Sequence, residues 1–210
     1  MVAEHKPRKS LPVYITPSEL HRLLGACQHD RDRRLIEFLW QTGARISEVL
    51  DVRAGDLTKS GVRLPNLKQT VMRKDAEGNR RRVSVQAEKH VILHPEYLAR
   101  LHAWTEGLDP TMLLFGRLED HKRMTRKRAW EIVKGAAARA GIARRRYGED
   151  QLAAVWPHTL RHSYAVHLLD NQVPVTVVSE QLGHSSLAST QIYTRLSNAR
   201  TAELIAGISF

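Results

Sequence analysis

Most of the chain places apolar residues at the spacing of an amphipathic helix. Thr16, Pro17 and Glu19 form a capping-box pattern, in which the N-cap threonine and the glutamate three residues later satisfy each other's free backbone groups. The next apolar residues lie three and four apart, on one helical face: Leu20, Leu23, Leu24 and Cys27. This pattern predicts a helix with one buried face, and it makes Cys27 a core thiol and not a nucleophile.

The same spacing predicts further helices along the chain. They begin near Asp30 (ending at Gly43), at Ile46 (to about Val52), at Pro95 (to about Trp104), after Thr125, at His158 and at Pro174 (ending at Gly183). The helix from Pro174 has Val177, Val178 and Leu182 as its apolar side. Short helices are also expected within 185–193 and 201–210.

The middle of the chain changes to a two-residue period. Residues 61–68, 80–85 and 90–93 are predicted as short strands, with a turn at 75–79 that contains Gly78 and Asn79. Pro65 indicates that the first strand is an edge strand or is interrupted. The predicted fold is therefore mainly α with a small antiparallel β-sheet (α+β).

The charge balance indicates a polyanionic partner. The chain has 33 Lys+Arg against 22 Asp+Glu, a formal net charge of +11, so double-stranded DNA is the expected partner. The predicted contact surface lies within 121–147, where the charges do not alternate in sign. Its candidate residues are Lys122, Arg123, Arg126, Lys127, Arg128, Lys134, Arg144, Arg145 and Arg146, the last three in a loop.

Residues 1–12 are basic and contain prolines, as in a flexible lead-in or linker. The chain has one cysteine, which fits a reducing compartment, and no apolar run long enough to span a membrane. These features predict a cytoplasmic protein with no membrane partner.

The chemistry is concentrated between His158 and Tyr193. His158 and Arg161 share one helical face, and His184 and Tyr193 follow. An arginine fork pairs with phosphate oxygens, a histidine moves protons near neutral pH, and a tyrosine can be a covalent nucleophile. A metal is not expected, because His158 and His162 have the spacing of a zinc pair but enclose a cation and no acid. No nucleotide-binding loop is present, and no cofactor is expected.

These motifs resemble the tyrosine recombinases, the phage-integrase family. The first region of resemblance is Thr42-Gly-Ala-Arg45-Ile-Ser-Glu48-Val-Leu50. The second is His158-x-x-Arg161, then Leu182-Gly183-His184, then Tyr193 nine residues later. Order and spacing agree with the family, which implies a tyrosine-recombinase catalytic-domain fold.

The resemblance implies a role for each matching residue. Arg45 and Arg161 would clamp the scissile phosphate, and Tyr193 would attack it to give a 3′-phosphotyrosyl intermediate. His158 would act in proton transfer, His184 would donate a hydrogen bond to the phosphate, and Glu48 would support Arg45. The family's lysine, which protonates the leaving 5′-oxygen, is matched best by Lys68, with Lys74 as the alternative.

Most members of the family carry a further N-terminal DNA-binding domain, for which this sequence has no room before Arg45. We therefore expect residues 13–210 to form a catalytic domain alone. The expected enzyme is a site-specific recombinase, a tetramer on DNA and weakly associated or monomeric without it. The alternatives are a type IB topoisomerase-like enzyme that relaxes DNA as a monomer, and a non-catalytic DNA-binding regulator.

Overall fold

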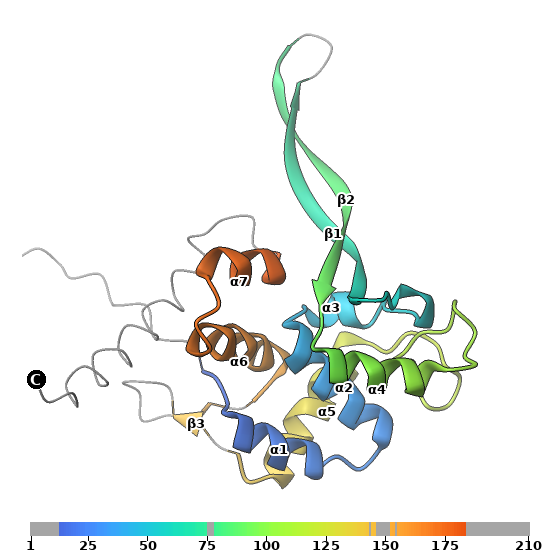
Figure 1. The fold of residues 1–210 in the computed structure, drawn as a ribbon, viewed down its shortest axis with the longest axis vertical. Helices are drawn as coiled ribbons and strands as arrows, with labels where there is room; N and C mark the ends of the chain where they lie inside the picture. Colours follow the sequence, from blue (N-terminus) through green and yellow to red (C-terminus); the bar gives the residue numbers. More distant parts are fainter. Residues whose placement is uncertain (1–12, 75–77, 143, 146–151, 154, 184–210) are drawn as a thin grey trace, which may run out of the picture.

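The computed structural model describes residues 13–74, 78–142, 144–145, 152–153 and 155–183 (Figure 1). Their elements are, in order, α1 (Pro17–Gly25), α2 (Asp30–Thr42), α3 (Ile46–Val49), η1 (Ala54–Asp56), β1 (Gly61–Lys74), β2 (Arg80–Ile92), α4 (Pro95–Thr105), α5 (Arg126–Arg139), β3 (Arg144–Arg145), β4 (Leu152–Ala153), α6 (Pro157–Asp170) and α7 (Val175–Leu182). The prediction of a mainly helical chain with a small antiparallel sheet is confirmed. Within these ranges, no helix has both the length and the apolar character needed to cross a membrane.

The predicted capping box starts α1. The backbone N–H of Glu19 donates to the Thr16 hydroxyl at 3.3 Å, and the backbone N–H of Thr16 donates to the Glu19 carboxylate at 2.8 Å. Leu20 and Leu23 are buried, and Cys27 is half-buried against the same core. Burial, with Asp32 nearby, raises the pKa of the Cys27 thiol to about 11, which suits a packing role.

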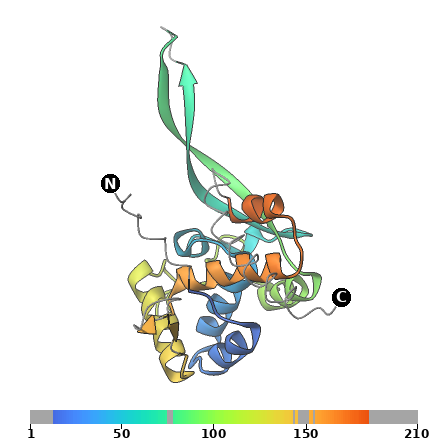
Figure 2. The same cartoon turned by 90° about the vertical axis from the view of Figure 1, so that its left-hand side faces the viewer.

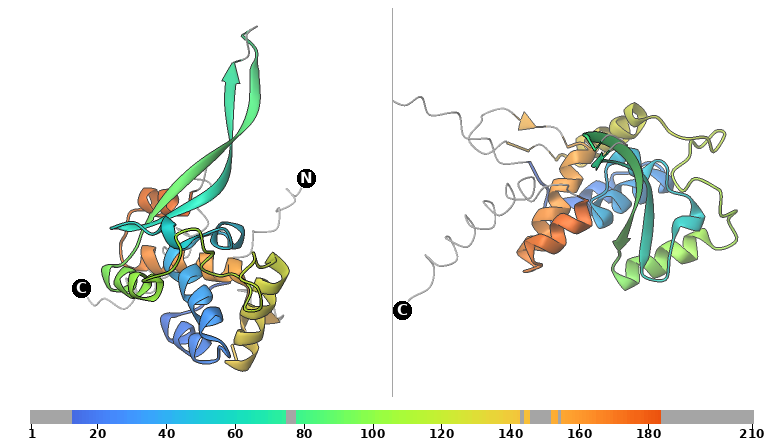
Figure 3. Two further views of the ribbon diagram at one scale, coloured as in Figure 1. Left: turned by 90° about the vertical axis from the view of Figure 1, so that its right-hand side faces the viewer. Right: turned by 90° about the horizontal axis from the view of Figure 1, so that it is seen from above.

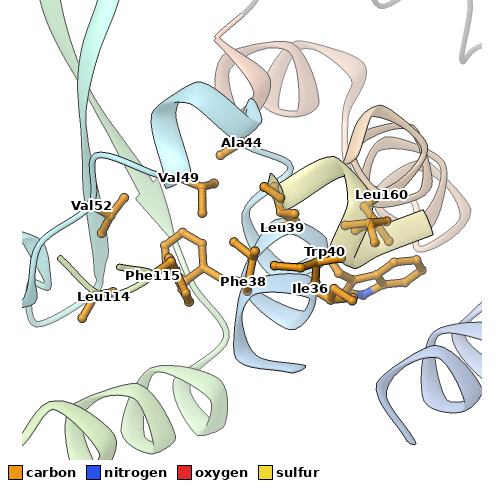
Figure 4. Packing of buried hydrophobic residues seen from close by; sticks show 14 of the residues in the cluster. Ile36, Phe38, Leu39, Trp40, Ala44, Val49, Val52, Leu114, Phe115 and Leu160 are labelled. Atoms are coloured by element: carbon orange, nitrogen blue, oxygen red, sulfur yellow. The ribbon is translucent and has the colours of Figure 1, made fainter. Parts of the chain in front are cut away.

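Helix α2 passes through the centre of the core. Leu35, Ile36, Phe38 and Leu39 are all fully buried, so this helix is covered on several sides. Phe38 meets Phe115 edge to face, with ring centroids 5.1 Å apart (Figure 4). This packing fixes the carboxyl end of α2, from which the segment Thr42–Leu50 continues.

The sheet β1–β2 is a long twisted hairpin that projects away from the helical body (Figures 2 and 3). The strands pair from Gly61 with Ile92 to Lys74 with Arg80, and the register shifts between Leu64 and Leu67. The interruption predicted at Pro65 is therefore present. The prediction of separate strands at 80–85 and 90–93 is wrong, because backbone pairing continues through the polar residues between them.

Other sequence predictions also need correction. Helix α3 ends at Val49 and not near Val52, whose carbonyl instead accepts a hydrogen bond from the backbone N–H of Leu114 at 3.0 Å. Arg144 and Arg145 lie in β3, paired with β4, and not in a loop. Val177 is 41% exposed, because the buried face of α7 is formed by Val178 and Leu182. The segments expected at 1–12, 185–193 and 201–210 lie outside the described residues.

We expect Gly43→Ala to destabilise the fold by about 2 kcal/mol or more. Gly43 ends α2 with φ +57°, and an added Cβ would lie 2.3 Å from Cδ1 of Tyr164. Gly141→Ala is the matched control, because its φ is +62° and no atom lies within 4 Å of the added Cβ. Urea unfolding of both variants measures the difference, and equal losses would show that the contact with Tyr164 does not matter.

Candidate functional site

Arg161 is a buried guanidinium that joins two helix ends. It lies on α6 with 3% of its surface exposed. Its Nη1 donates to the carbonyl of Gly43 at 2.6 Å, and its Nη2 donates to the carbonyl of Leu182 at 2.8 Å. Carbonyls at the carboxyl end of a helix lack partners within the helix and carry partial negative charge, so a cation stabilises them. Arg161 thereby fixes the end of α2 against the end of α7.

Arg45 lies two residues beyond Gly43, at the N-cap of α3. Its backbone N–H donates to Glu48 Oε2 at 2.8 Å, and its Nη1 donates to Glu48 Oε1 at 2.8 Å. The Glu48 side chain is 4% exposed, whereas the Arg45 side chain is 41% exposed. Glu48 thus holds Arg45 by two hydrogen bonds, while much of the Arg45 side chain stays exposed.

His158 lies one turn before Arg161, in the first turn of α6. The pKa of its imidazole is lowered, first by partial burial and then by Arg161 and Arg45. Two arginines from distant parts of the sequence therefore act on the same imidazole. The shift favours the neutral ring, which can accept a proton.

The structure gives no support for a metal at this site. The rings of His158 and His162 lie 5.6 Å apart, but no group of three or more potential metal ligands occurs in the part of the chain that is described. His167, also on α6, has its ring centroid 5.8 Å from that of Trp40.

Lys89 lies close to the charges of Arg45, Glu48 and Arg161. The sequence prediction did not identify this residue. It lies on β2 with 8% of its surface exposed, and its Nζ has no hydrogen-bond partner among the described residues. Burial lowers the pKa of its amine to about 7; Glu48 opposes this shift, and Arg161 and Arg45 add to it. A Cβ built on Gly183 would lie 3.1 Å from Lys89 Cδ, so the side chain packs against the end of α7.

A sequence signal for Lys89 does exist. In a strand, residues two apart share a face, and Val91 is fully buried. Lys89 also pairs with Leu64, which is fully buried on the opposite strand. Extending the buried face of β2 by one step would have placed a lysine in the core.

Lys68 and Lys74, the two candidates for the family's lysine, lie at different positions along the hairpin. Lys68 pairs with Gln86, and Lys74 ends β1 opposite Arg80. At about 3.3 Å per residue, Lys74 lies roughly 20 Å further along the strand, toward the tip. This position favours Lys68 over Lys74, and the choice stays a prediction. His184 and Tyr193 lie outside the described residues, and Gly183 ends α7 with φ +66° immediately before His184.

The predicted DNA-binding surface is in part solvent-exposed and in part paired. Side chains exposed on or before α5 are those of Lys122, Arg123, Arg126, Lys127, Arg128 and Lys134. Arg123 pairs with Asp51, and Lys134 lies over the ring of Trp130 at 4.9 Å. Trp130 in turn stacks on Trp156, with ring centroids 6.1 Å apart. Arg144 and Arg145 lie in β3, and Arg146 is outside the described residues.

We expect Lys89→Met to stabilise the chain, most strongly at low pH. The amine has a pKa of about 7 in the folded chain and an ordinary value of 10.5 when unfolded. The unfolded chain therefore binds more protons between these values, and the cost of burying the charge is full below about pH 7 and absent above about pH 10.5. The variant should exceed the wild type by roughly 2 kcal/mol or more below neutral pH, with the difference shrinking as pH rises.

Thermal and urea unfolding across this pH range measure the effect. Lys122→Met is the matched control, because that side chain is 77% exposed. A Lys89→Met variant whose stability has the same pH dependence as the wild type would contradict the assignment of a buried, unpaired amine.

Comparison with known proteins identifies the family. A model of the phage integrase family matches residues 13–200. The tyrosine recombinase XerD of Pseudomonas aeruginosa is 33% identical over 201 residues, which cover 93% of this chain and 61% of that protein. The XerD of Corynebacterium glutamicum is 33% identical over 197 residues, which cover 90% of this chain and 58% of that protein. The chain thus spans less than two thirds of the length of these relatives.

Solved structures agree on the fold. The XerA recombinase superimposes with a TM-score of 0.67 at 23% identity, covering 98% of this chain and 67% of that one. XerH bound to its palindromic difH substrate superimposes with a TM-score of 0.58 at 24% identity, covering 94% of this chain and 53% of that one. The family match covers most of the sequence, and the described elements have the fold of these recombinases. The chain therefore belongs to the phage integrase family of tyrosine recombinases.

Proposed function

We propose that this chain is the catalytic domain of a site-specific DNA recombinase, which cleaves and rejoins DNA through a 3′-phosphotyrosyl intermediate without metal or ATP. The observation that carries the proposal is the convergence of Arg45, His158 and Arg161. These groups come from two distant segments, which meet where Arg161 donates to the carbonyl of Gly43, two residues before Arg45. Partial burial lowers the pKa of the His158 imidazole, and both arginines add to this shift. Fixed cations beside a neutral proton acceptor are what phosphoryl transfer requires.

The two arginines are suited to different parts of phosphate binding. Arg45 is 41% exposed, so its guanidinium can turn toward a phosphodiester and pair with its non-bridging oxygens. Arg161 is held by the carbonyls of Gly43 and Leu182, so its charge is fixed before the substrate arrives. A preorganised cation stabilises the negative charge that develops in the transition state, because little reorganisation is then needed.

The proposed reaction conserves the energy of the phosphodiester bond. The Tyr193 oxygen attacks phosphorus, its proton passes to neutral His158, and the bond from phosphorus to the 5′-oxygen breaks. Lys68 gives its proton to that oxygen, and His184 donates a hydrogen bond to the phosphate. Attack by a 5′-hydroxyl on the phosphotyrosine reverses these steps and rejoins DNA.

The partner proposed for this chain is double-stranded DNA. The net charge of +11 and the exposed cations before and along α5 fit a polyanion. Among proteins of similar fold, XerH is solved with its difH substrate, and lambda integrase is solved as a dimer bound to a core site. We propose that this chain acts in the cytoplasm, is weakly associated or monomeric alone, and forms a tetramer on two DNA sites.

We expect the chain to form a covalent adduct with nicked DNA. A pool of duplexes of random sequence, each with a central nick, traps the intermediate because the short 5′-hydroxyl product diffuses away. The wild type should give a band that survives denaturing electrophoresis, and Tyr193→Phe should abolish it. Arg45→Ala should lower it by about 100-fold or more, since one oxyanion-stabilising donor is worth that much.

Tyr97→Phe is the matched control for the loss of a tyrosine hydroxyl. Its Oη is buried and has no hydrogen-bond partner among the described residues, and it lies on α4. This variant should keep the adduct. An adduct that persists in Tyr193→Phe, or no adduct with any sequence, would contradict the proposal. Relaxation of a supercoiled plasmid without paired sites would instead favour the topoisomerase-like activity.

A further inference from the structure

One buried carboxylate belongs to a cluster that also contains three cations. Glu48 binds both the backbone and the side chain of Arg45, and Glu48, Arg45 and Arg161 all act on the amine of Lys89. The charges that act on the Lys89 amine are those of Glu48 and Arg45 at α3 and of Arg161 on α6. Among the described residues, Lys89 also pairs with Leu64 on β1 and packs against Gly183 after α7, and neither of these carries a charge. The cluster therefore holds a surplus of positive charge around one buried acid.

The burial of Lys89 destabilises the folded chain. A buried amine without a hydrogen bond loses its hydration and gains nothing in return, and a buried unpaired ammonium costs more. Its Nζ has no partner in the described part of the chain, although the Glu48 carboxylate is near enough to act on it. Each oxygen of that carboxylate already accepts one hydrogen bond from Arg45.

That arrangement changes if Arg45 turns its Nη1 from Glu48 to a phosphate. The N–H that binds Glu48 Oε1 cannot at the same time donate to a phosphate oxygen. Once it turns outward, Glu48 loses its side-chain partner while its own side chain is only 4% exposed. A buried carboxylate left without a cation is strongly destabilised. Lys89 is the nearby buried cation whose amine is not already bonded.

We propose that Lys89 is a positioning residue that replaces Arg45 as the partner of Glu48 when Arg45 turns to a DNA phosphate, taking up one proton from solvent as it does so. This inference rests on the proposed function of Arg45. The exchange keeps the Glu48 carboxylate neutralised in both states, so Arg45 can leave it at low cost. It also couples phosphate binding to proton uptake, because the Lys89 amine is largely neutral above about pH 7 before the exchange.

The exchange can be tested without DNA, because Arg45→Met imitates the state in which Arg45 has left Glu48. NMR of the intact chain labelled with [ε-13C]lysine gives the pKa of Lys89, whose signal is assigned by its loss in Lys89→Met. Arg45→Met should raise this pKa for two reasons: a like charge is removed, and Glu48 becomes available. Only the second reason depends on Glu48.

A double-mutant cycle separates the two effects. The rise caused by Arg45→Met should be larger by about one pKa unit or more with Glu48 present than in a chain that already carries Glu48→Gln. Equal rises in both backgrounds would mean that simple repulsion explains the shift, and would overturn the proposal. A purely structural role for Lys89 predicts no such coupling.

A matched control variant shows whether the effect is specific to Arg45. Arg53→Met is the control, because Arg53 is also an exposed arginine whose backbone N–H donates to an acid three residues later, Asp56, at 2.8 Å. It should leave the Lys89 titration unchanged. If Arg45→Met does not fold, Arg45→Gln tests the same cycle. A cycle that shows coupling in a chain that forms no DNA adduct would refute the recombinase proposal alone, and an adduct without coupling would refute only the exchange.

Discussion

The hydrogen bonds from Arg161 to the carbonyls of Gly43 and Leu182 set the geometry on which the rest of the site depends. One carbonyl follows the central core helix α2, and the other ends α7. Arg45 lies two residues beyond the first, and Lys89 packs against Gly183 beside the second. A single buried side chain thus brings together the two halves of a site that lie more than a hundred residues apart in the sequence.

The charge of this site is concentrated at a cost to stability. Arg45, Lys89 and Arg161 lie in one cluster with the buried carboxylate of Glu48. Burial, with the two arginines adding to it, lowers the pKa of the Lys89 amine to about 7. Such a cluster is unfavourable in the free protein, because like charges repel and buried charges lose hydration. In the proposed function, a phosphodiester bound by Arg45 brings negative charge to this cluster. The feature that weakens the free fold would then favour DNA at this position.

The sequence was sufficient where the signal is local. The capping box at Thr16, the left-handed ends at Gly43 and Gly183, and the buried face of α1 follow from short-range rules, and each is present. The site residues Arg45, His158 and Arg161 were identified from the resemblance to the tyrosine recombinases, and the fold places them together. Tyr193 and His184 were identified in the same way, and they lie outside the described residues.

The sequence did not predict features that depend on pairing or packing between segments far apart in the chain. The long pairing of β1 with β2 and the pairing of Arg144 and Arg145 with β4 depend on partners that no local pattern reveals. Lys89 was missed because a lysine is assumed to be solvated, and its burial depends on Leu64 across the strand and Gly183 at the end of α7. Val177 was misplaced because α7 is short and buries only a narrow face.

The free energy of unfolding of Arg161→Met tests most directly whether one guanidinium assembles the site. Arg139→Met is the comparison, because Arg139 is exposed and its Nε donates to the carbonyl of Ala26 at 2.8 Å, also just after a helix. Urea unfolding should show a loss of about 3 kcal/mol or more for Arg161→Met, because two buried carbonyls lose their partner, and less than about 1 kcal/mol for Arg139→Met. Equal losses for the two variants would contradict the account.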